Sequence, residues 1–377
     1  MSEREAEVVV VGGGIVGLAV AWRLAQRGHT VDVFEQGELG RGASWAAAGM
    51  LAPTAELGFE ELDLYRLGRE SLRRWPTFAE ELEAASGQPV GYDATGTLVV
   101  ADDRDSTEAL RRLYRFQQEH AAASTWLAGF EALDREPFLA PGLPAAVFSL
   151  EDHQVDPRAV AQALVRVLRA HVAVAVHEQI TVQAIEPDAE TSAVVLDDGT
   201  RIMARAVVLA AGAWTRRIAG LEPKPPVRPI KGQALALRVA EPFALRHVVR
   251  GPDAYLVPKA DGRLIVGATS EEQGFDTRVT AGAVYRLLEG AVAVVPGVEE
   301  LEVIETWAGL RPASRDHAPL LGFGAVPGVA FATGHYRHGV LLAPVTADEI
   351  AAAVEARLAG SVETSAWLAP FSPDRFS

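Results

Sequence analysis

The segment VVVVGGGIVGLAVAWRLAQRGHTVDVFE, residues 8–35, decides the fold of this chain. Its four valines, 8–11, predict a short strand that is buried on both faces. Apolar residues at helical spacing predict a helix over 15–27, which Gly28 ends. Residues 31–34 predict a second strand. A strand, a helix and a second strand in this order predict a parallel βαβ unit.

A glycine turn joins the first strand to the helix. Gly12, Gly14 and Gly17 follow the pattern G-x-G-x-x-G. The first glycine permits the tight turn, the second lets a pyrophosphate approach the backbone, and the third lets helix pack on strand. Glu35 closes the second strand, where a carboxylate binds ribose hydroxyls. A glycine turn without a ligand is the alternative, but strand, helix and acid occur together here, so we predict a dinucleotide site.

The same glycine pattern and acid occur in NAD-binding and FAD-binding proteins, and three features favour FAD. The second strand leads into GRGASWAAAGML, residues 40–51, whose small side chains let backbone pass close to a flat ring. A nicotinamide dehydrogenase would more often continue directly into another strand and helix. A second glycine turn, at Gly334, precedes a helix whose positive end can face the flavin edge where negative charge collects on reduction.

Later segments predict the rest of the fold. Residues 205–214 and 328–354 each read as a strand that runs into a glycine turn, and the segments between them alternate as antiparallel strands do, with a hairpin turn at 260–262. We predict an α/β fold with a Rossmann-like FAD-binding domain built on a parallel sheet, plus an inserted, mostly antiparallel substrate domain of α+β character. The predicted FAD-binding domain comprises 1–80, 150–225 and 305–377, the substrate domain comprises 81–149 and 226–304, and 222–229 forms a crossing linker.

Composition narrows the function. The chain has 377 residues and a formal charge of −15, which argues against nucleic acid and anionic membranes as partners. It has no cysteine, so disulfides, thiolate metal sites and flavin linked through sulfur are excluded, and we predict non-covalent FAD. The N-terminus lacks a basic region, and the apolar stretch 8–22 is too short to span a bilayer. We therefore expect a cytoplasmic protein without stable membrane association.

One arginine stands among apolar residues in TWAGLRPASRDHAPLLG, residues 306–322. Arg311 keeps its proton inside a protein, and a buried charge without a partner costs roughly 3–5 kcal/mol. The partner is either an internal carboxylate, with Asp316 and Glu305 as candidates, or a carboxylate that arrives with a substrate. A planar guanidinium suits both because it grips a carboxylate through two parallel hydrogen bonds.

Other chemical motifs are absent from the sequence. His335 and His338 lie three residues apart, a spacing that metal sites use, but no nearby acid or third histidine completes such a site, and we predict no metal. Neither a G-x-S-x-G elbow nor an H-E-x-x-H motif occurs. No covalent nucleophile is needed if a flavin carries the redox chemistry.

With these residues in view, the chain resembles the glycine oxidase group, of the thiamine-pathway type, in the D-amino acid oxidase family of FAD enzymes. The resemblance covers nearly the whole chain. It rests on VVGGGIVGLAVAWRLAQRG, ASWAAAGMLAP, VRPIKGQ, AYLVPKADGRLIVGAT, WAGLRPASRDHAPLLG and GHYRHGVLLAP. The last two, in this order and spacing, are the most specific of them.

The resemblance implies roles for the substrate end of the site. Arg311 would hold the substrate carboxylate, Tyr255 would hydrogen-bond the same group, and Met50 would lie on the substrate side. Arg337 would belong to the charge network beside substrate or flavin. The alternatives are a strand tyrosine packed by its ring and a loop arginine that faces solvent. Ser270, where a pocket-narrowing methionine can occur, and Asp253 depart from the family pattern and leave substrate size open.

The resemblance also implies a cofactor shell that runs along the whole dinucleotide. Its members are the glycines 12, 14 and 17 with Ile15 and Val16 at the pyrophosphate, Glu35 and Gln36 at the ribose, Ala43, Ser44, Ala48, Gly49 and Met50 along the phosphates and ring, Val182 at the adenine, Gly212, Gly334, and the turn His335, Tyr336, Arg337, His338, Gly339, Val340 and Leu341 at the flavin.

The expected reaction is oxidation of a small amino acid, such as glycine, sarcosine, D-alanine or D-proline, to an oxo acid, ammonia and hydrogen peroxide. Dioxygen would be the second substrate, and no general base is evident in the sequence. The rival readings are a flavin-dependent D-amino acid or proline dehydrogenase with another electron acceptor, a flavin-containing tRNA-modification domain, a non-catalytic FAD-binding protein and a nicotinamide dehydrogenase. The family also suggests a homotetramer.

Overall fold

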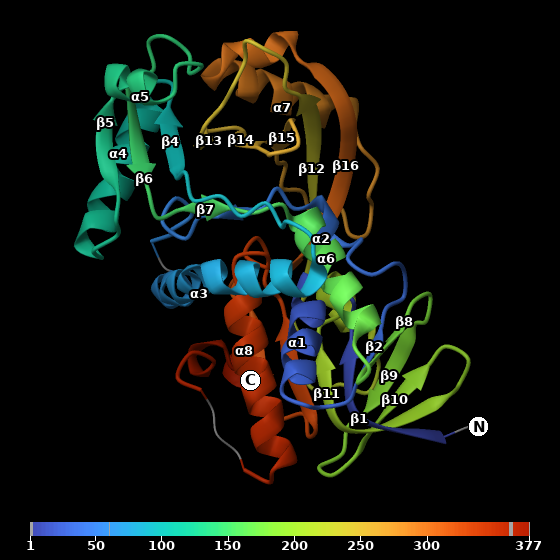
Figure 1. The fold of residues 1–377 in the computed structure, drawn as a ribbon. Helices are drawn as coiled ribbons and strands as arrows, with labels where there is room; N and C mark the ends of the chain where they lie inside the picture. Colours follow the sequence, from blue (N-terminus) through green and yellow to red (C-terminus); the bar gives the residue numbers. More distant parts are fainter. Residues whose placement is uncertain (1–2, 60, 362–364, 377) are drawn as a thin grey trace.

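The molecule has two sheets at opposite ends, with α3 and α2 between them (Figure 1). It is a computed structural model that describes residues 3–59, 61–361 and 365–376. No helix in this described part of the chain is long and apolar enough to cross a membrane. The helices are α1 Ile15–Gln26, α2 Ala43–Ala46, α3 Leu62–Ser86, α4 Arg104–Glu119, α5 Gly129–Arg135, α6 Pro157–Ala170, α7 Ala281–Val294 and α8 Ala343–Leu358, with short 3₁₀ turns η1 Gly212–Arg217, η2 Pro296–Glu300, η3 Ala369–Phe371 and η4 Pro373–Phe376.

The first sheet has a parallel centre. Its main path is β17-β18-β11-β1-β2-β8, and β10 and β9 continue from the first half of β11. Strands β17, β10 and β9 join this sheet through antiparallel pairs, β17 with β18, β10 with β11, and β9 with β10. Its strands are β1 Glu3–Val11, β2 Val31–Phe34, β8 Val174–His177, β9 Val182–Glu186, β10 Ser192–Leu196, β11 Arg201–Leu209, β17 Leu320–Phe323 and β18 Val329–Thr333. The βαβ unit and both later parallel strands predicted from sequence are confirmed.

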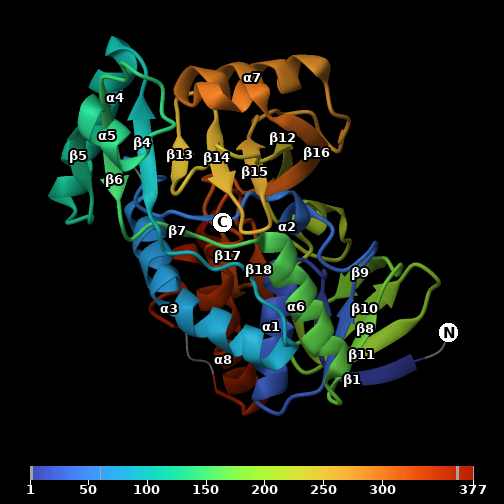
Figure 2. The same ribbon diagram turned by 45° about the horizontal axis from the view of Figure 1, so that its top comes forward.

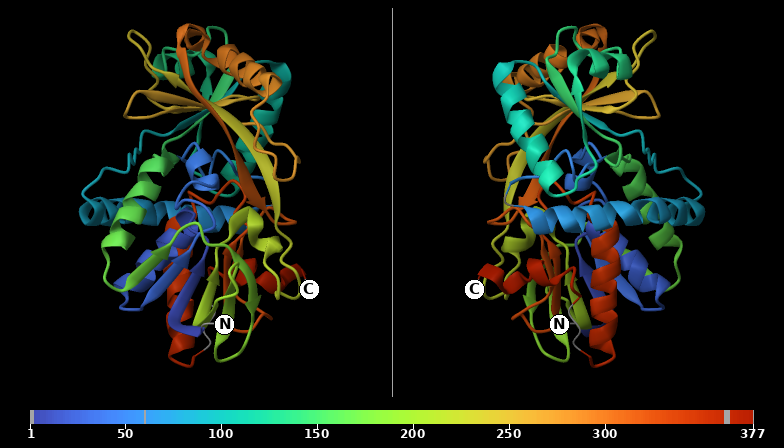
Figure 3. Two further views of the ribbon diagram at one scale, coloured as in Figure 1. Left: turned by 90° about the vertical axis from the view of Figure 1, so that its right-hand side faces the viewer. Right: turned by 90° about the vertical axis from the view of Figure 1, so that its left-hand side faces the viewer.

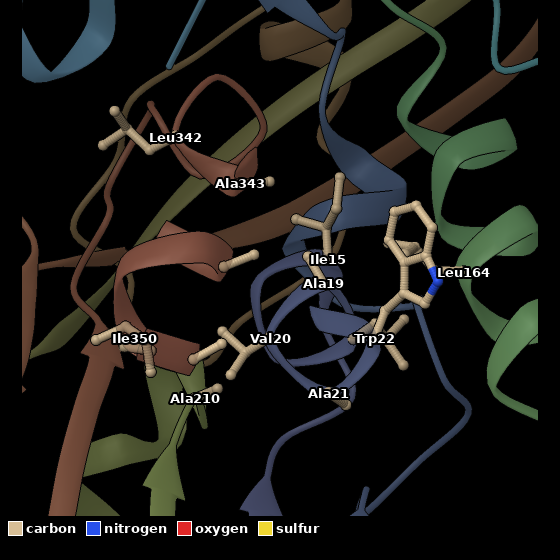
Figure 4. Close-up of a cluster of buried hydrophobic side chains, with 14 of the residues drawn as sticks. Ile15, Ala19, Val20, Ala21, Trp22, Leu164, Ala210, Leu342, Ala343 and Ile350 are labelled. Atoms are coloured by element: carbon tan, nitrogen blue, oxygen red, sulfur yellow. The ribbon is translucent and has the colours of Figure 1, made fainter. Parts of the chain in front are cut away.

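Helix α1 lies in the core between α8 and α6 (Figure 4). Its buried side chains cover most of its circumference, and Leu18, Val20 and Leu24 are fully enclosed. A helix that is apolar on nearly all sides is stable only when other elements surround it. This enclosure fixes the N-terminus of α1 against the sheet, directly after the glycine turn.

The second sheet is antiparallel except where β13 runs parallel to β4. Its order is β16-β12-β15-β14-β13-β4-β6-β5, and α7 covers one face (Figure 2). Its strands are β4 Thr97–Ala101, β5 Thr125–Ala128, β6 Ala145–Ser149, β12 Arg228–Arg238, β13 Val248–Arg250, β14 Tyr255–Pro258, β15 Arg263–Gly267 and β16 Glu302–Ala313. A separate two-stranded pair, β3 Met50–Leu51 with β7 His153–Gln154, lies between the sheets.

Alternation along the strands gives the second sheet two different faces. Leu235 and Leu237 pack in the cluster beneath α7, whereas Ala236 packs in a cluster that also contains Ala48. Side chains alternate between faces along a strand, so every second residue of β12 points toward the first sheet. The long β12 and β16 run side by side from the second sheet down toward the first (Figure 3). Small residues on this lower face leave space between the sheets.

The predicted hairpin at 260–262 is confirmed, because β14 and β15 pair across it. The predicted linker 222–229 leads from η1 beside the first sheet into β12 of the second. The division into an FAD-binding domain of three ranges and a substrate domain of two ranges stays a prediction. Its boundary at 80/81 falls inside α3 and its boundary at 304/305 falls inside β16, because both elements span the junction of the two halves.

Candidate active site

A cavity of about 530 Å³ lies between the two sheets. One end lies at the glycine turn and at the carboxyl ends of β1 and β2. The other end lies under the lower face of the second sheet, where Tyr255 of β14 and Arg311 of β16 line the wall. Ligands of open α/β sheets bind at the carboxyl ends of the strands, and this cavity follows that rule.

The glycine turn places backbone where side chains cannot fit. Gly12 has a φ of +110°, and a Cβ built on it would lie 2.4 Å from the Ala210 carbonyl oxygen. A Cβ on Gly17 would lie 2.0 Å from the Gly12 carbonyl oxygen, so this glycine lets α1 pack on the turn. Gly14 caps α1 without a side-chain hydrogen bond, and the Ile15 amide donates to Ser44 Oγ at 2.8 Å. First-turn amides of α1 therefore face the cavity with the positive end of the helix dipole.

Glu35 lies at the end of β2, where the acid was predicted. Its two carboxylate oxygens accept hydrogen bonds from the amides of Gly13 at 2.8 Å and Gly37 at 2.9 Å. These bonds orient the side chain at the cavity wall. A carboxylate has about four lone-pair directions, so acceptor capacity is left for the hydroxyls of a ribose.

The turn before α8 forms another part of the cavity wall. His335, Tyr336, Arg337, Gly339 and Val340 line it. His335 is buried and its Nε2 lies 3.1 Å from Thr346 Oγ1, and burial lowers its pKa to about 3. The imidazole is therefore neutral at physiological pH. Because α8 follows this turn directly, the positive end of its dipole points toward the cavity.

Arg311 is half-buried on β16, opposite Ile230 of β12. Its Nη1 donates to the Thr269 carbonyl oxygen at 2.9 Å. Within residues 3–59, 61–361 and 365–376, no carboxylate oxygen lies within 4.0 Å of its guanidinium nitrogens. A guanidinium has five N–H donors, so most of them are left for a ligand in the cavity.

The internal carboxylates considered as partners of Arg311 are paired elsewhere. Glu305 makes a two-pronged ion pair with Arg158, at 2.7 and 3.0 Å. Asp316 makes one with Arg375, at 2.8 and 2.9 Å. The internal-pair interpretation of Arg311 is therefore wrong for both candidates.

Tyr255 lies beside Arg311 at the same end of the cavity. A Cβ built on Gly267 would lie 2.5 Å from the Tyr255 hydroxyl oxygen, so the ring packs directly against the glycine backbone of β15. Burial raises the pKa of this hydroxyl, and the charge of Arg311 opposes the rise. The phenol therefore stays protonated and can donate a hydrogen bond.

The structure also brings an acid to this end that the sequence did not single out. Glu56 lines the cavity, and its side chain is only 10% exposed. Its Oε1 lies 3.3 Å from Arg250 Nη1 and its Oε2 lies 3.5 Å from His338 Nδ1. Burial alone would raise the pKa of Glu56, but four basic neighbours hold it below its usual value: His338, Arg250, Arg337 and Arg311. Glu56 is thus an ionised carboxylate rather than a strong base.

Long-range hydrogen bonds position Glu56. Its neighbours Thr54 and Ala55 donate their amides to the buried Asp152 carboxylate at 3.0 and 2.7 Å. The only sequence signal for Glu56 is its place just after ASWAAAGMLAP. Nothing in that position distinguishes it from the other acids of the segment, and so it was missed.

Most of the predicted site residues line this single cavity. Those that do are Gly12, Gly14, Ile15, Val16, Glu35, Gln36, Ala43, Ser44, Ala48, Gly49, Met50, Val182, Gly212, Tyr255, Arg311, His335, Tyr336, Arg337, Gly339 and Val340.

Four predicted residues do not line the cavity. Gly17 packs beneath Gly12, and Gly334 adopts a φ of +76° that turns the chain out of β18. His338 points to Glu56, and Leu341 belongs to the core, where its carbonyl oxygen accepts from Ser71 and Trp75. These residues therefore lie behind the cavity wall and support it.

Neither departure from the family pattern narrows the cavity. Ser270 is exposed, and its Oγ lies 3.4 Å from the Tyr336 hydroxyl. Asp253 is exposed in the loop before β14. Neither lines the cavity wall.

The residues present fit FAD. The glycine turn and the amides of α1 suit a pyrophosphate, and Glu35 suits a ribose. Small residues in α2 and in the stretch 47–49 that follows it leave the middle of the cavity open to a flat ring system. A Cβ on Gly309 of β16 would lie 2.3 Å from the Ala46 Cβ, so backbone closes tightly around this part of the cavity.

Comparisons with known proteins agree with this geometry. A family model described as FAD dependent oxidoreductase (DAO) matches residues 7–353. The chain is 38% identical over 375 residues to the glycine oxidase of Geobacillus kaustophilus, covering 98% of this chain and 97% of that protein. It is 35% identical to the bifunctional protein ThiO/ThiG of Synechocystis, covering 98% of this chain and 54% of that protein. The crystal structure of the Geobacillus kaustophilus glycine oxidase superposes with a TM-score of 0.90 at 36% identity, covering 99% of each chain.

Proposed function

The chain belongs to the DAO family of FAD-dependent oxidoreductases, and we propose that within it the protein is an oxidase of small amino acids. Its substrate is glycine or a close analogue, such as sarcosine, D-alanine or D-proline. Glycine or D-alanine gives an oxo acid, ammonia and hydrogen peroxide. Sarcosine gives methylamine in place of ammonia, and D-proline gives a cyclic imine that keeps its nitrogen. The likeness to glycine oxidases and to a ThiO/ThiG protein supports this choice and a role in making the thiazole of thiamine.

One observation carries the proposal. Arg311 lines the cavity without a carboxylate partner in the described part of the chain, while both acids nearest in sequence pair with other arginines. An unpaired guanidinium in a partly buried site is unfavourable unless a ligand brings the opposite charge. The carboxylate of an amino acid matches it in shape and in charge.

The chain's own residues orient the substrate. Arg311 holds the carboxylate through two parallel N–H groups, and the Tyr255 hydroxyl donates to the same group. Glu56, ionised and near both, favours a positive ammonium group at this end. FAD, when bound, supplies a two-electron acceptor for the hydride of the α-carbon and passes the electrons to dioxygen.

The packing behind this end of the cavity supports a small substrate. Tyr255 and Met50 pack in the same cluster as Val257 and Ile265, so the wall behind the substrate is filled. Discrimination by one methylene is worth about 1–3 kcal/mol, which allows several small amino acids to react.

Anaerobic mixing tests the proposal. The purified yellow protein is mixed with glycine, sarcosine, D-alanine and D-proline, and the flavin absorbance is followed. At least one of them is expected to bleach the yellow band, and admission of air is expected to restore it with one peroxide formed per turnover. Bleaching without peroxide would identify a dehydrogenase, and no bleaching by any of the four would contradict the proposal.

A further inference from the structure

The guanidinium of Arg311 rests flat on the backbone of β12. A Cβ built on Gly232 would lie 2.4 Å from Arg311 Nη1 and 2.5 Å from both Cζ and Nη2. Non-bonded carbon and nitrogen atoms do not approach so closely, so any side chain at Gly232 would displace the guanidinium. The bare backbone of Gly232 therefore forms one contact surface of the Arg311 guanidinium.

The loop after β15 provides a second contact of the Arg311 guanidinium. The Thr269 carbonyl oxygen accepts from Arg311 Nη1 at 2.9 Å. Where Thr269 lies thus decides where the guanidinium points, because a hydrogen bond from an arginine fixes the plane of the whole group.

Glu271 holds Thr269 in place. The Thr269 hydroxyl donates to Glu271 Oε1 at 2.6 Å, and Gln233 Nε2 donates to the same oxygen at 2.7 Å. The backbone amide of Gln233 donates to Thr269 Oγ1 at 2.9 Å. Glu271, Thr269 and the buried Gln233 therefore form a closed network that ties the loop to β12.

Backbone contacts reinforce this network. Lys231 and Glu271 exchange two amide-to-carbonyl hydrogen bonds, each 2.9 Å long. Burial alone would raise the pKa of Glu271, but the hydrogen bonds from Thr269 and Gln233, with the charges of Lys231 and Arg286, hold it below its usual value. Glu271 is therefore a charged acceptor on the far side of Thr269 from Arg311.

We propose that Glu271 is a positioning residue for carboxylate recognition, acting on Arg311 through Thr269. By fixing Thr269 against β12, it sets the direction in which the guanidinium meets the substrate. This inference rests on the proposed function, since it assumes that Arg311 binds the substrate carboxylate. The role belongs to one oxygen of Glu271, Oε1, which accepts both hydrogen bonds.

Four variants of the FAD-loaded protein test the inference. Glu271→Leu removes the acceptor at similar size, and Glu271→Gln keeps an oxygen in its place while removing the charge. Thr269→Val removes the hydroxyl and keeps the carbonyl group. Glu272→Gln is the matched control, because its side chain is 72% exposed and pairs with Arg228 at the surface. Calorimetry measures the Kd of acetate, a bare carboxylate, and steady-state assays with glycine separate KM from kcat.

Glu271→Leu and Thr269→Val are each expected to raise the Kd of acetate and the KM of glycine about tenfold, with kcat within about twofold. Glu271→Gln and Glu272→Gln are expected to stay within about threefold of the wild type. The inference is overturned if Thr269→Val binds acetate as the wild type does. It is also overturned if Glu271→Gln loses as much as Glu271→Leu, because charge and not the accepted bonds would then matter.

A further variant separates this inference from the proposed function. Arg311→Leu is expected to abolish acetate binding. If Arg311→Leu still binds acetate with wild-type affinity, the proposed function fails. If Arg311→Leu loses acetate while Thr269→Val keeps it, the proposed function stands and the role of Glu271 fails.

Discussion

At the glycine-turn end of the cavity, the residues that suit phosphate and ribose come from one βαβ unit, whereas at the arginine end the charged residues come from segments far apart in sequence. Gly12, Gly14 and Glu35 belong to one βαβ unit, in which Glu35 accepts hydrogen bonds from the amides of Gly13 and Gly37. Arg311 and Tyr255 lie on separate strands of the second sheet, and Glu56 follows β3. The first end binds with backbone and the second with charged side chains.

This difference decides what each end tolerates. Backbone amides and a helix dipole are fixed once α1 is packed, so the glycine-turn end depends on shape. The arginine end depends on orientation, because a guanidinium must meet a carboxylate in plane. Substitutions at the first end should therefore affect the cofactor, and substitutions at the second should affect substrate while the cofactor stays bound.

The largest effect is expected from Gly12→Ala. Its φ of +110° is unfavourable for alanine, and the new methyl group would lie 2.4 Å from the Ala210 carbonyl oxygen. The purified variant is expected to contain almost no FAD by absorbance. Gly28→Ala is the control, because Gly28 also has a positive φ but no atom within 4 Å of an added Cβ. Full FAD content in Gly12→Ala would contradict the claim that cofactor binding depends on the shape of the glycine turn.

A smaller and more selective effect is expected from Gly232→Ala. The added methyl group displaces the Arg311 guanidinium and leaves the backbone of β12 intact. We expect the KM of glycine to rise about thirtyfold, since a displacement of about 1 Å costs up to a hundredfold. FAD content, measured on the same sample, is expected to match the wild type. Loss of FAD together with substrate binding would show that the two ends are not separable.

Glu56→Gln sharpens the electrostatic part of the comparison. Removing this charge leaves the positive groups around it less compensated. Acetate is expected to bind about threefold tighter, whereas glycine, which carries an ammonium group, is expected to bind about threefold more weakly. Titration gives the Kd of acetate, and the concentration dependence of the anaerobic flavin-reduction rate gives the Kd of glycine. Glu38→Gln, an exposed acid near the other end, is the control. Equal shifts for the two ligands would contradict a role for Glu56 near the ammonium group.

The smallest effect concerns stability. Burial raises the pKa of Asp152 to about 7 from an ordinary value of 3.8, despite its two backbone hydrogen bonds. Between about pH 4 and 7 the folded protein therefore keeps a proton that the unfolded chain releases, and the free energy of unfolding falls as the pH rises through this window. We expect the melting temperature to fall by about 2–4 °C from pH 5 to 8. This slope should be flatter in Asp152→Asn, and an equal slope in both proteins would contradict the assignment.

The two ends also differ in how far the sequence predicts them. The glycine turn, α1 and Glu35 could be read from local pattern, because strand, turn and helix determine one another over a few residues. Arg311 could be noticed as a lone charge, but its freedom from Glu305 and Asp316 could not be predicted. That freedom depends on Arg158 and Arg375, which approach from distant segments.

Glu56 and Thr269 show the same limit more clearly. Glu56 reaches the cavity because Asp152 holds the segment before it, and Thr269 matters through its carbonyl group, which no side-chain pattern reveals. In the sequence Gly232 is an ordinary strand glycine, and only the structure shows that the Arg311 guanidinium packs on its backbone. Sequence patterns of this kind report local structure, whereas these residues depend on tertiary contacts.

The central claim is that Arg311 recognises the substrate by its carboxylate, and the most direct test compares glycine with glycinamide. Glycinamide keeps the amine and replaces the carboxylate by a neutral amide. The wild type is expected to prefer glycine by about a hundredfold or more in kcat/KM, and Arg311→Leu, with its FAD retained, is expected to use the two with similar, low efficiency. A wild-type preference for glycine in Arg311→Leu would contradict the claim, because another group would then be reading the carboxylate.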